Sequence, residues 1–465
     1  MTAAAAPRRV ARRAPAFGAV WLARQVRELI GGLRGAQLCV AYSGGADSTA
    51  LLAALAAQRA RCGFALRAVH LNHHLQPQAS SMAKAALGSA RRLGVACVVL
   101  PARVRVARGQ SIEAAARKVR YAALRSQLRP GEWLLLAQHR DDQSETLLLQ
   151  LLRGAGIAGL AAMPERSGVL LRPLLEVTRA ALRAYLRRRG LTWREDPSNA
   201  DERFDRNYLR RRVMPQIEAR WPAASATIAR SARLAAEAQQ LLEAQADQLL
   251  RAAADGPALQ VAVLRRLKPA ECRNALRRWL SLRELPLPDQ RRLLELAGPV
   301  LRARYDAQPQ VAWPGALVRR HRDLLYACSA PIGEAPPIAR LAPLLWHWQA
   351  QPRLALPGGG SLRLAPDAAG PLAIATLPAR FEIRFRVGGE RLAARHGRQT
   401  LKRLLQAHHL PPWLRGAVPL LYRDERLVAV ADWWCEPELR HGGAGSGAPA
   451  GKRARLQWLP PRVPI

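Results

Sequence analysis

The chain has 465 residues, too many for one ordinary hydrophobic core, so two or three domains are expected. Its 73 lysines and arginines against 34 acidic residues give a net charge of +39, which favours a polyanionic partner such as nucleic acid. No apolar run approaches the roughly 18 residues that span a bilayer. We therefore expect no membrane span. The six cysteines are scattered and form no Cys-x-x-Cys pair, so a zinc ribbon or an iron–sulfur cluster is not expected, and we expect a cytoplasmic protein.

The basic charge is only a partial indicator of nucleic-acid binding. Nearly all basic residues are arginines, and alanine is abundant, which points to a compositional bias that adds arginine to every surface. The lysines are confined to positions 84, 118, 268, 402 and 452. Residues 1–17 are rich in arginine and alanine and lack acidic side chains. A disordered basic arm fits this stretch better than an organelle transit peptide.

Apolar stretches alternate with helical stretches through the first half of the chain. A lead-in helix is predicted at 21–33, and a short strand at 169–171 and a helix at 179–189 close the unit. This alternation predicts a doubly wound parallel sheet with helices on both faces. The predicted strands are 38–42, 64–71, 95–100 and 133–137, and the predicted helices are 48–59, 79–93, 111–128 and 142–153.

The second half of the chain changes in composition twice. Helical spacing dominates from about 221 to 296, whereas proline, glycine and short alternating strands follow. A last compact region ends near Cys435, and a glycine-rich linker begins at Gly442. We therefore predict a basic arm at 1–17, a nucleotide-binding catalytic domain at 18–215, a helical middle domain at 216–300, a β-containing segment at 301–380, a small α+β C-terminal domain at 381–440 and a flexible tail at 441–465.

A glycine-rich turn follows the first predicted strand and opens the next helix. Paired glycines let backbone amides approach an anion, and the serines and the helix N-terminus add donors. No lysine follows, as a Walker loop requires, and the spacing does not match a dinucleotide fingerprint. The sequence predicts a phosphate cradle, although a tight turn without a ligand is the simpler alternative. The residues of this turn are Ser43, Gly44, Gly45, Ala46, Asp47 and Ser48.

Carboxylates cluster after the fourth predicted strand, at Asp141, Asp142 and Glu145. Asp142 and Glu145 are spaced as a helix capping box, so one of the aspartates could be structural. Carboxylates beside a phosphate cradle would repel ATP unless a cation such as Mg²⁺ intervened. We therefore predict a catalytic or Mg²⁺-linked role for Asp47 and Asp141, shared by Asp142 together with capping.

Three further groups carry polar chemistry. His70, His73 and His74 end the second strand, but no carboxylate or cysteine completes a metal site, so one of them could equally contact a nucleotide or shape the loop. Arg117 belongs to a helix face that is either solvated or in contact with phosphate or nucleic acid. The charged segment 193–212 suits a site for a zwitterionic substrate beside a polyanion.

The Ser-Gly-Gly-x-Asp-Ser loop resembles that of the PP-loop ATP pyrophosphatases, and the chain as a whole is similar to the tRNA(Ile)-lysidine synthetase family. The resemblance covers most of the chain, and its specific parts are the segment from Asp196 to Asn207 and the C-terminal block. The matching stretches are 43–48, 69–75, 112–121, 139–146, 154–159, 195–212, 385–390, 401–405 and 411–413.

The resemblance implies that ATP adenylates the wobble cytidine of the CAU-anticodon isoleucine tRNA and that free L-lysine then displaces AMP. The loop would hold the leaving pyrophosphate, with Mg²⁺ on Asp47 and Asp141. Asp141 or Asp142 could take a proton from the lysine ammonium, which Glu145 and Asp196 are candidates to bind.

The resemblance also assigns residues that bind the nucleotide, the substrates and tRNA, and it allows a homodimer. A tRNA thiolase is the alternative within the superfamily, and a catalytically silent RNA-binding protein is the alternative outside it. The scattered cysteines argue against the first and the intact polar residues against the second. The assigned residues are His73 and His139 for the nucleotide, Arg117, Asn199, Arg206 and Arg210 for the substrates, and Lys402, Arg403 and Trp413 for tRNA.

Overall fold

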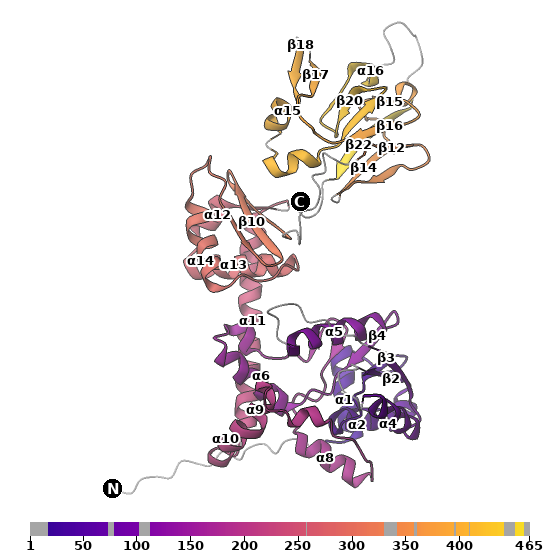
Figure 1. Ribbon diagram of the computed structural model, residues 1–465, viewed down its shortest axis with the longest axis vertical. Helices are drawn as coiled ribbons and strands as arrows, with labels where there is room; N and C mark the ends of the chain where they lie inside the picture. Colours follow the sequence, from indigo (N-terminus) through magenta and orange to yellow (C-terminus); the bar gives the residue numbers. More distant parts are fainter. Residues whose placement is uncertain are drawn as a thin grey trace, which may run out of the picture. The chain divides into compact units, whose positions relative to one another are not determined.

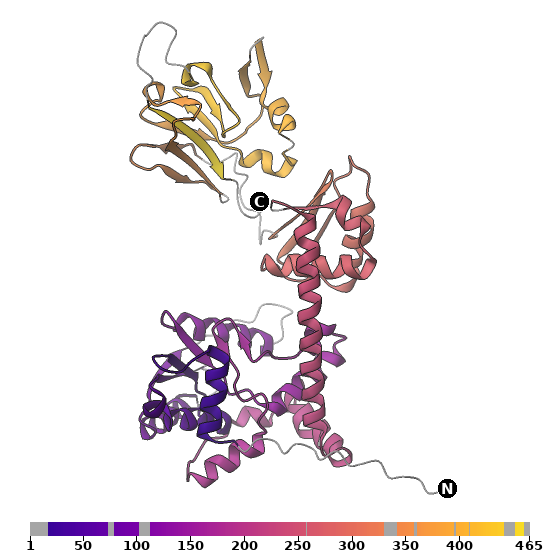
Figure 2. The same cartoon turned by 180° about the vertical axis from the view of Figure 1, so that it is seen from behind.

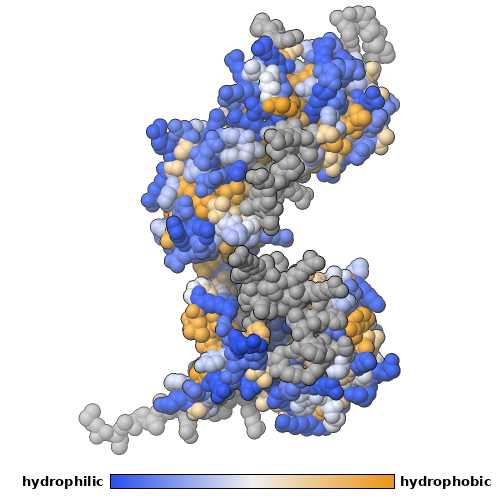
Figure 3. Space-filling model, viewed as in Figure 1, coloured by the Kyte–Doolittle hydropathy of each residue, from blue (hydrophilic) through white to orange (hydrophobic). Residues whose placement is uncertain are grey.

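The structure is a computed structural model that divides the chain into two compact units, Met1–Leu241 and Leu242–Ile465. No helix in the part of the chain that it describes is both long and apolar enough to cross a membrane. Hydrophilic residues cover most of the visible described surface, in keeping with the high charge (Figure 3). The described residues are 17–72, 79–101, 112–256, 258–329, 342–357, 360–394, 397–408, 410–440 and 452–459.

The first unit is built on a sheet with the strand order β3-β2-β1-β4-β6-β5. All neighbouring strands are parallel except β5, which runs antiparallel to β6. This confirms the predicted doubly wound parallel sheet. The strands are β1 Gln37–Ala41, β2 Ala65–Asn72, β3 Ala96–Pro101, β4 Glu132–Leu135, β5 Arg166–Ser167 and β6 Leu170–Leu171.

Helices cover both faces of this sheet (Figure 1). One face packs against α1, α2, α4 and α8 in a core that contains Leu22, Leu51 and Leu182. The other face packs against α5, where Leu124 and Leu134 share a smaller core. The helices of this unit are α1 Ala19–Ile30, α2 Ala46–Ala56, α3 Arg59–Cys62, α4 Ala79–Arg92, α5 Ile112–Ser126, α6 Arg140–Leu152, α7 Ile157–Leu160, α8 Arg179–Arg188, η1 Pro197–Ala200, α9 Asp205–Tyr208, η2 Leu209–Val213, α10 Met214–Arg220 and α11 Ala224–Ala253.

The strand order places a ligand crevice at the end of β1. The chain moves outward from β1 through β2 to β3 and then returns to β4 on the opposite side of β1. In such sheets ligands bind beyond the carboxyl ends of the strands where the order reverses. The glycine-rich loop follows β1, and the carboxylate segment follows β4, so both predicted groups meet at this crevice.

A buried ion pair between β2 and β4 lies at the other end of the sheet from the crevice. Glu132 of β4 is 4% exposed, and its carboxylate accepts hydrogen bonds from Arg67 Nε at 2.6 Å and from the Arg129 backbone N–H at 3.0 Å. Burial favours the neutral acid, but these donors hold the pKa of Glu132 below its usual value. Stability from this pair is therefore present above about pH 4.5 and is lost as pH falls through the lowered pKa.

We expect Glu132→Gln to destabilise the first unit by about 2 kcal/mol at pH 7, because Arg67 loses its charge partner while remaining largely buried. The difference from the wild type should shrink below pH 4.5, as measured by urea unfolding. Glu28→Gln is the control, since Glu28 is 61% exposed and lies 3.9 Å from Arg24, and it should change stability by less than about 0.5 kcal/mol. An equal loss in both variants would contradict the prediction.

Helix α11, drawn as one uninterrupted helix in Figure 2, leads into the second unit. This unit begins with a sheet of order β7-β8-β11-β10-β9, packed on helices through Leu276, Leu296 and Val318. Because β11 pairs with β8, the sheet crosses residue 300, where the sequence placed a boundary between a helical domain and a β segment. The elements are β7 Ala254–Asp255, β8 Ala258–Gln260, α12 Val261–Arg266, α13 Pro269–Leu282, α14 Gln290–Glu295, η3 Leu296–Val300, β9 Gln310–Trp313, β10 Ala316–His321 and β11 Leu324–Cys328.

The C-terminal part of this unit contains sheets of order β12-β16-β19-β20-β21 and β13-β14-β22-β15 around one core, together with a two-stranded sheet of β17 and β18. Strand β22 pairs with β14 from Ala454 to Leu459, so the expected flexible tail contains a core strand. The elements are β12 Leu344–Trp346, β13 Arg353–Ala355, β14 Ser361–Pro366, β15 Leu372–Ala373, η5 Ile374–Thr376, β16 Phe381–Arg384, β17 Arg391–Ala394, β18 Gly397–Thr400, α15 Leu401–Ala407, η6 Pro412–Ala417, β19 Leu420–Arg423, β20 Arg426–Val430, β21 Trp434–Cys435, α16 Pro437–Arg440 and β22 Arg453–Leu459.

Candidate active site

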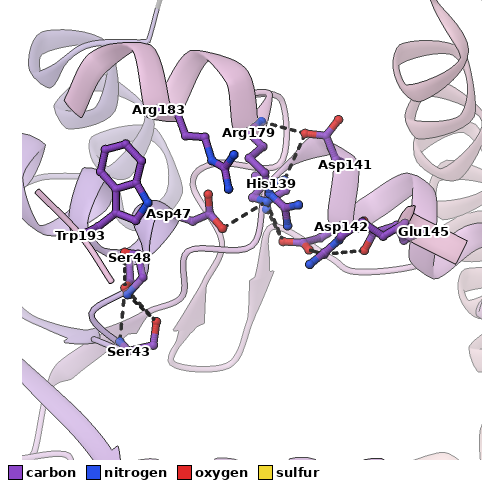
Figure 4. A network of polar contacts seen from close by, with 12 residues as sticks. Ser43, Asp47, Ser48, His139, Asp141, Asp142, Glu145, Arg179, Arg183 and Trp193 are labelled. Carbon is purple, nitrogen blue, oxygen red and sulfur yellow. Dashed lines mark hydrogen bonds and ion pairs between the residues drawn. The ribbon is translucent and has the colours of Figure 1, made fainter. Parts of the chain in front are cut away.

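The glycine-rich loop forms a compact turn between β1 and α2. Gly44 has φ of +82°, a left-handed conformation that disfavours any side chain. The hydroxyls of Ser43 and Ser48 lie 3.0 Å apart (Figure 4). The Gly45 N–H donates to Ser43 Oγ at 3.3 Å. These contacts hold the loop at the N-terminus of α2, where backbone N–H groups and the helix dipole favour an anion.

Asp47 lies in the first turn of α2 and points toward the carboxylate segment (Figure 4). Its Oδ2 lies 3.4 Å from His139 Nε2. Its Oδ1 is buried and has no hydrogen-bond partner among the described residues. Because buried polar atoms are nearly always satisfied, this oxygen is suited to a ligand or a cation.

His139 is the centre of the carboxylate cluster and has no exposed surface. Its ring nitrogens lie 3.3 Å from Asp141 Oδ2, 3.5 Å from Asp142 Oδ2 and 3.4 Å from Asp47 Oδ2. Burial lowers the pKa of His139, but the charges of Asp142, Asp141 and Asp47 outweigh it and raise the pKa to about 10. The ring is thus enclosed among three carboxylates whose charges favour its protonated form, and its contact with a nucleotide stays a prediction.

Asp141 joins three helices. Its Oδ2 accepts a hydrogen bond from the Arg179 N–H at the start of α8 (2.7 Å), and its Oδ1 accepts one from the Ser225 hydroxyl at the start of α11 (2.9 Å). Burial opposes ionisation, yet His139 and these donors hold the pKa of Asp141 well below its usual range. Asp141 is therefore a carboxylate held in one orientation.

Asp142 caps α6, but its partner differs from the one that the spacing suggested. The helix begins at Arg140, and the Asp142 carboxylate accepts from the His139 backbone N–H at 3.1 Å, so the capping pair is His139 and Asp142 rather than Asp142 and Glu145. The guanidinium groups of Arg206 and Arg210 lie 3.3 and 2.9 Å from Asp142 Oδ1. The positive charges of His139, Arg206 and Arg210 lower the pKa of Asp142 against the effect of its burial.

Glu145 is held by the same two arginines. Its side chain is 3% exposed and accepts from Arg206 Nε at 3.0 Å and from Arg210 Nε at 2.6 Å. The cluster thus gathers four carboxylates, of which Asp142 and Glu145 are paired with arginines, whereas Asp47 Oδ1 has no hydrogen-bond partner among the described residues.

Magnesium fits this arrangement better than a metal held by protein alone. Among the described residues, no group of three or more histidine, cysteine, aspartate or glutamate side chains is placed to hold a metal ion. Mg²⁺ commonly takes one or two carboxylates and completes its shell with water and phosphate oxygens. The buried, unpartnered Oδ1 of Asp47, next to an anion-binding loop, meets that requirement.

The other predicted site residues lie in different settings. His70 is 5% exposed, its Nδ1 lies 2.9 Å from the Tyr42 carbonyl oxygen, and burial lowers its pKa, so it is an internal residue of β2. His73 and the side chain of Arg117 lie outside the described residues. Asp196 and Asn199 form a turn around η1, in which the Asp196 carbonyl accepts from the Asn199 N–H at 3.0 Å.

A short part of the charged segment 193–212 crosses the loop. The Arg194 N–H donates to the Gly44 carbonyl at 3.2 Å. The Glu195 carboxylate accepts from Arg183 at 2.7 Å and from Trp193 Nε1 at 3.0 Å. Residues 193–195 therefore cover the phosphate cradle. In the sequence, only the polar character of 193–212 indicated that this segment lies at the site. Nothing in the sequence indicated that Arg183 of α8 would pair with it.

Trp413, predicted to bind tRNA, is half-buried and packs within the second unit, and its contact with tRNA stays a prediction. Its ring lies 5.3 Å from the Arg319 guanidinium, 5.8 Å from the His321 ring and 5.7 Å from the Tyr326 ring. Lys402 and Arg403 are exposed on α15 and are available to a partner.

An anion loop and a carboxylate cluster at the switch point of a doubly wound sheet define an ATP-using enzyme of the PP-loop class, and residues 19–217 match the family model described as a PP-loop domain. Residues 259–326 match a TilS substrate binding domain, and residues 381–458 match a TilS substrate C-terminal domain. The tRNA(Ile)-lysidine synthase of Alkalilimnicola ehrlichii is 44% identical over 406 residues, which cover 85% of this chain and 89% of that protein. The chain belongs to the tRNA(Ile)-lysidine synthase family and is a ligase.

Other members of the family are similar to this chain over comparable lengths. The tRNA(Ile)-lysidine synthase of Methylococcus capsulatus is 41% identical over 90% of this chain and 96% of its own length. The tRNA(Ile)-lysidine synthase of Coxiella burnetii is 38% identical over 85% of this chain and 88% of its own length. The family resemblance seen in the sequence is confirmed.

Proposed function

We propose that this enzyme ligates free L-lysine to the position-two carbon of the wobble cytidine in the CAU-anticodon isoleucine tRNA, and that it converts ATP to AMP and pyrophosphate. The observation that carries the proposal is the anion loop facing an acidic cluster across one crevice. The loop suits a polyphosphate, and the cluster suits a cationic second substrate. A cytoplasmic location accompanies this proposal as an expectation.

In the first step, the cytosine O2 attacks the α-phosphorus of ATP. A bond forms between this oxygen and phosphorus, the α–β phosphoanhydride bond breaks, and pyrophosphate leaves. Backbone donors around Gly44 and Gly45 and the Ser43 hydroxyl would stabilise the charge on the leaving group. Mg²⁺ held by Asp47 and Asp141 would supply further neutralisation of the phosphate oxygens.

In the second step, the lysine side-chain amine attacks the position-two carbon, the bond from that carbon to O2 breaks, and AMP leaves. The ammonium must first lose a proton, for which Asp141 or Asp142 is the proposed acceptor. Glu145 is the proposed ammonium ligand, with Asp196 as a second candidate. A carboxylate accepts about four hydrogen bonds, and the two arginines supply three to Glu145, so one acceptor position remains.

The test is direct. Purified protein with ATP, Mg²⁺, labelled lysine and the isoleucine tRNA should place label in the RNA and form one AMP per lysine transferred. The same tRNA with uridine at the wobble position should receive none. Transfer of sulfur, or AMP formation without lysine incorporation, would overturn the proposal.

The C-terminal domain should contribute phosphate contacts through Lys402 and Arg403. Replacing both with glutamine should weaken tRNA binding and flatten its salt dependence by about one log–log unit for each lost contact. Filter binding over a range of salt concentrations measures this slope. Lys452→Gln, an exposed lysine beside β22, is the matched control. An unchanged slope in the double variant would assign α15 a structural role.

A further inference from the structure

Arg183 is an arginine of α8 that the proposed reaction leaves without a role. Its side chain extends from α8 toward Asp47 (Figure 4). Its Nη2 donates to the Glu195 carboxylate at 2.7 Å, whereas its Nε is buried and has no hydrogen-bond partner among the described residues. Because buried polar atoms nearly always have a partner, this nitrogen is suited to an acceptor on a bound molecule.

Glu195 places a negative charge next to that of Arg183. Its Oε1 accepts the bond from Arg183 and a second from Trp193 Nε1 at 3.0 Å. A carboxylate offers about four acceptor positions, so others remain for a ligand. A phosphate brought to Arg183 would also meet the Glu195 carboxylate, which opposes it. The pair is therefore suited to a ligand that carries an anionic and a cationic group side by side.

The proposed function leaves one end of the substrate lysine unassigned. Glu145 is proposed for the side-chain ammonium, and a chain of methylene groups separates that ammonium from the α-carbon, which carries a carboxylate and a second ammonium. In Figure 4, Arg183 and Trp193 lie on one side of the polar network, and Asp142 and Glu145 lie on the other. Arg183 and Glu195 thus offer, away from Glu145, the two charges that an amino-acid head group requires.

We propose that Arg183 binds the α-carboxylate of lysine and Glu195 its α-ammonium, so that the pair selects an amino acid over a simple diamine. This inference rests on the proposed function, because it concerns one substrate of that reaction. The Arg183 Nε would donate to the carboxylate in a charge-assisted hydrogen bond. Trp193 holds Glu195 in place, and the bond from the Arg194 N–H to the Gly44 carbonyl fixes their segment against the loop.

The experiment measures the binding of three ligands to the full-length protein by calorimetry, with ATP and Mg²⁺ present. The ligands are L-lysine, cadaverine, which lacks the carboxylate, and ε-aminocaproate, which lacks only the α-ammonium. Arg183→Gln should weaken the binding of lysine and of ε-aminocaproate about thirtyfold, the effect of one lost charge-assisted hydrogen bond, and should not weaken cadaverine binding. Glu195→Gln should weaken lysine and cadaverine binding about fivefold, because this carboxylate is 59% exposed, and should spare ε-aminocaproate.

Arg187→Gln is the matched control, because Arg187 is an exposed arginine one turn further along α8. It should change none of the three affinities. The affinity for ATP, measured separately, should stay within twofold of the wild type in every variant. Cadaverine serves as an internal control for Arg183→Gln, since a distorted crevice would weaken the binding of all three ligands.

Equal losses of lysine and cadaverine binding in Arg183→Gln would overturn the inference, because Arg183 would then act without contacting the carboxylate. A loss of ATP affinity with unchanged lysine binding would also overturn it, since Arg183 would then be a phosphate ligand. The proposed function fails separately, if the wild type transfers no lysine to tRNA. Equal affinities for lysine and cadaverine in a wild type that does transfer lysine would contradict this inference alone.

Discussion

Asp47→Asn should lower the rate of AMP formation about a thousandfold, the upper part of the range for loss of one electrostatic group in an active site. The reason is the position of its carboxylate, which lies in the first turn of α2 beside the anion loop and keeps one buried oxygen without a partner. Asparagine preserves the shape of the side chain but removes the charge that would bind Mg²⁺. The affinity for tRNA should stay within twofold, because Asp47 faces the nucleotide crevice.

The measurement pairs AMP release from labelled ATP with filter binding of tRNA. Asp205→Asn is the control, since Asp205 is 71% exposed and lies 3.6 Å from Arg153 at the surface of the same unit. It should change neither quantity. If Asp47→Asn lowered tRNA binding as much as AMP formation, a folding defect would replace the catalytic explanation.

The loop could be predicted from sequence because its determinants are local. Gly44 requires a left-handed backbone, Ser43 and Ser48 bond within five residues of each other, and the apolar stretch before them forms β1. The alternation of strands and helices likewise fixed the sheet class. Such features depend on neighbouring residues, so spacing alone reveals them.

The position of the carboxylate cluster could be predicted from the sequence, but the partners of its carboxylates could not. Its residues follow β4 in the sequence, yet the partners of Glu145 are Arg206 and Arg210, about sixty positions later. The hydroxyl that orients Asp141 comes from Ser225, at the start of a different helix. Only the tertiary fold brings these groups together. The capping pair of α6 was wrong for a local reason: the helix begins at Arg140, two residues before the expected start, so Asp142 pairs with the His139 N–H.

The last strand shows where a local pattern was overlooked. Ala454, Leu456 and Trp458 are buried, and the residues between them are more exposed, which is the period of two expected of a strand with one buried face. The glycine-rich stretch before it suggested a flexible tail instead. The boundary at residue 300 failed for another reason: the pairing of β8 with β11 joins segments separated by more than sixty residues.

Glu145→Gln should raise the KM for lysine about thirtyfold while pyrophosphate release from ATP and tRNA continues without lysine. A charge-assisted hydrogen bond is worth about 1.5–3 kcal/mol, which corresponds to a loss of this size. The same substitution should destabilise the first unit by about 3 kcal/mol, because Arg206 and Arg210, about one-fifth exposed, lose the carboxylate that holds them. Lysine-dependent kinetics and urea unfolding measure the two effects.

The matched control is Glu202→Gln. Glu202 also accepts from two arginines, Arg211 at 3.1 Å and Arg212 at 3.0 Å, but it is 28% exposed and lies outside the acidic cluster. Its loss should leave the lysine KM unchanged, so a rise confined to Glu145→Gln cannot come from the loss of a paired carboxylate alone. If pyrophosphate release and lysine transfer fell together, Glu145 would act only by holding Arg206 and Arg210 in place. If stability fell with an unchanged lysine KM, the ammonium would bind elsewhere, and Asp196 would become the leading candidate.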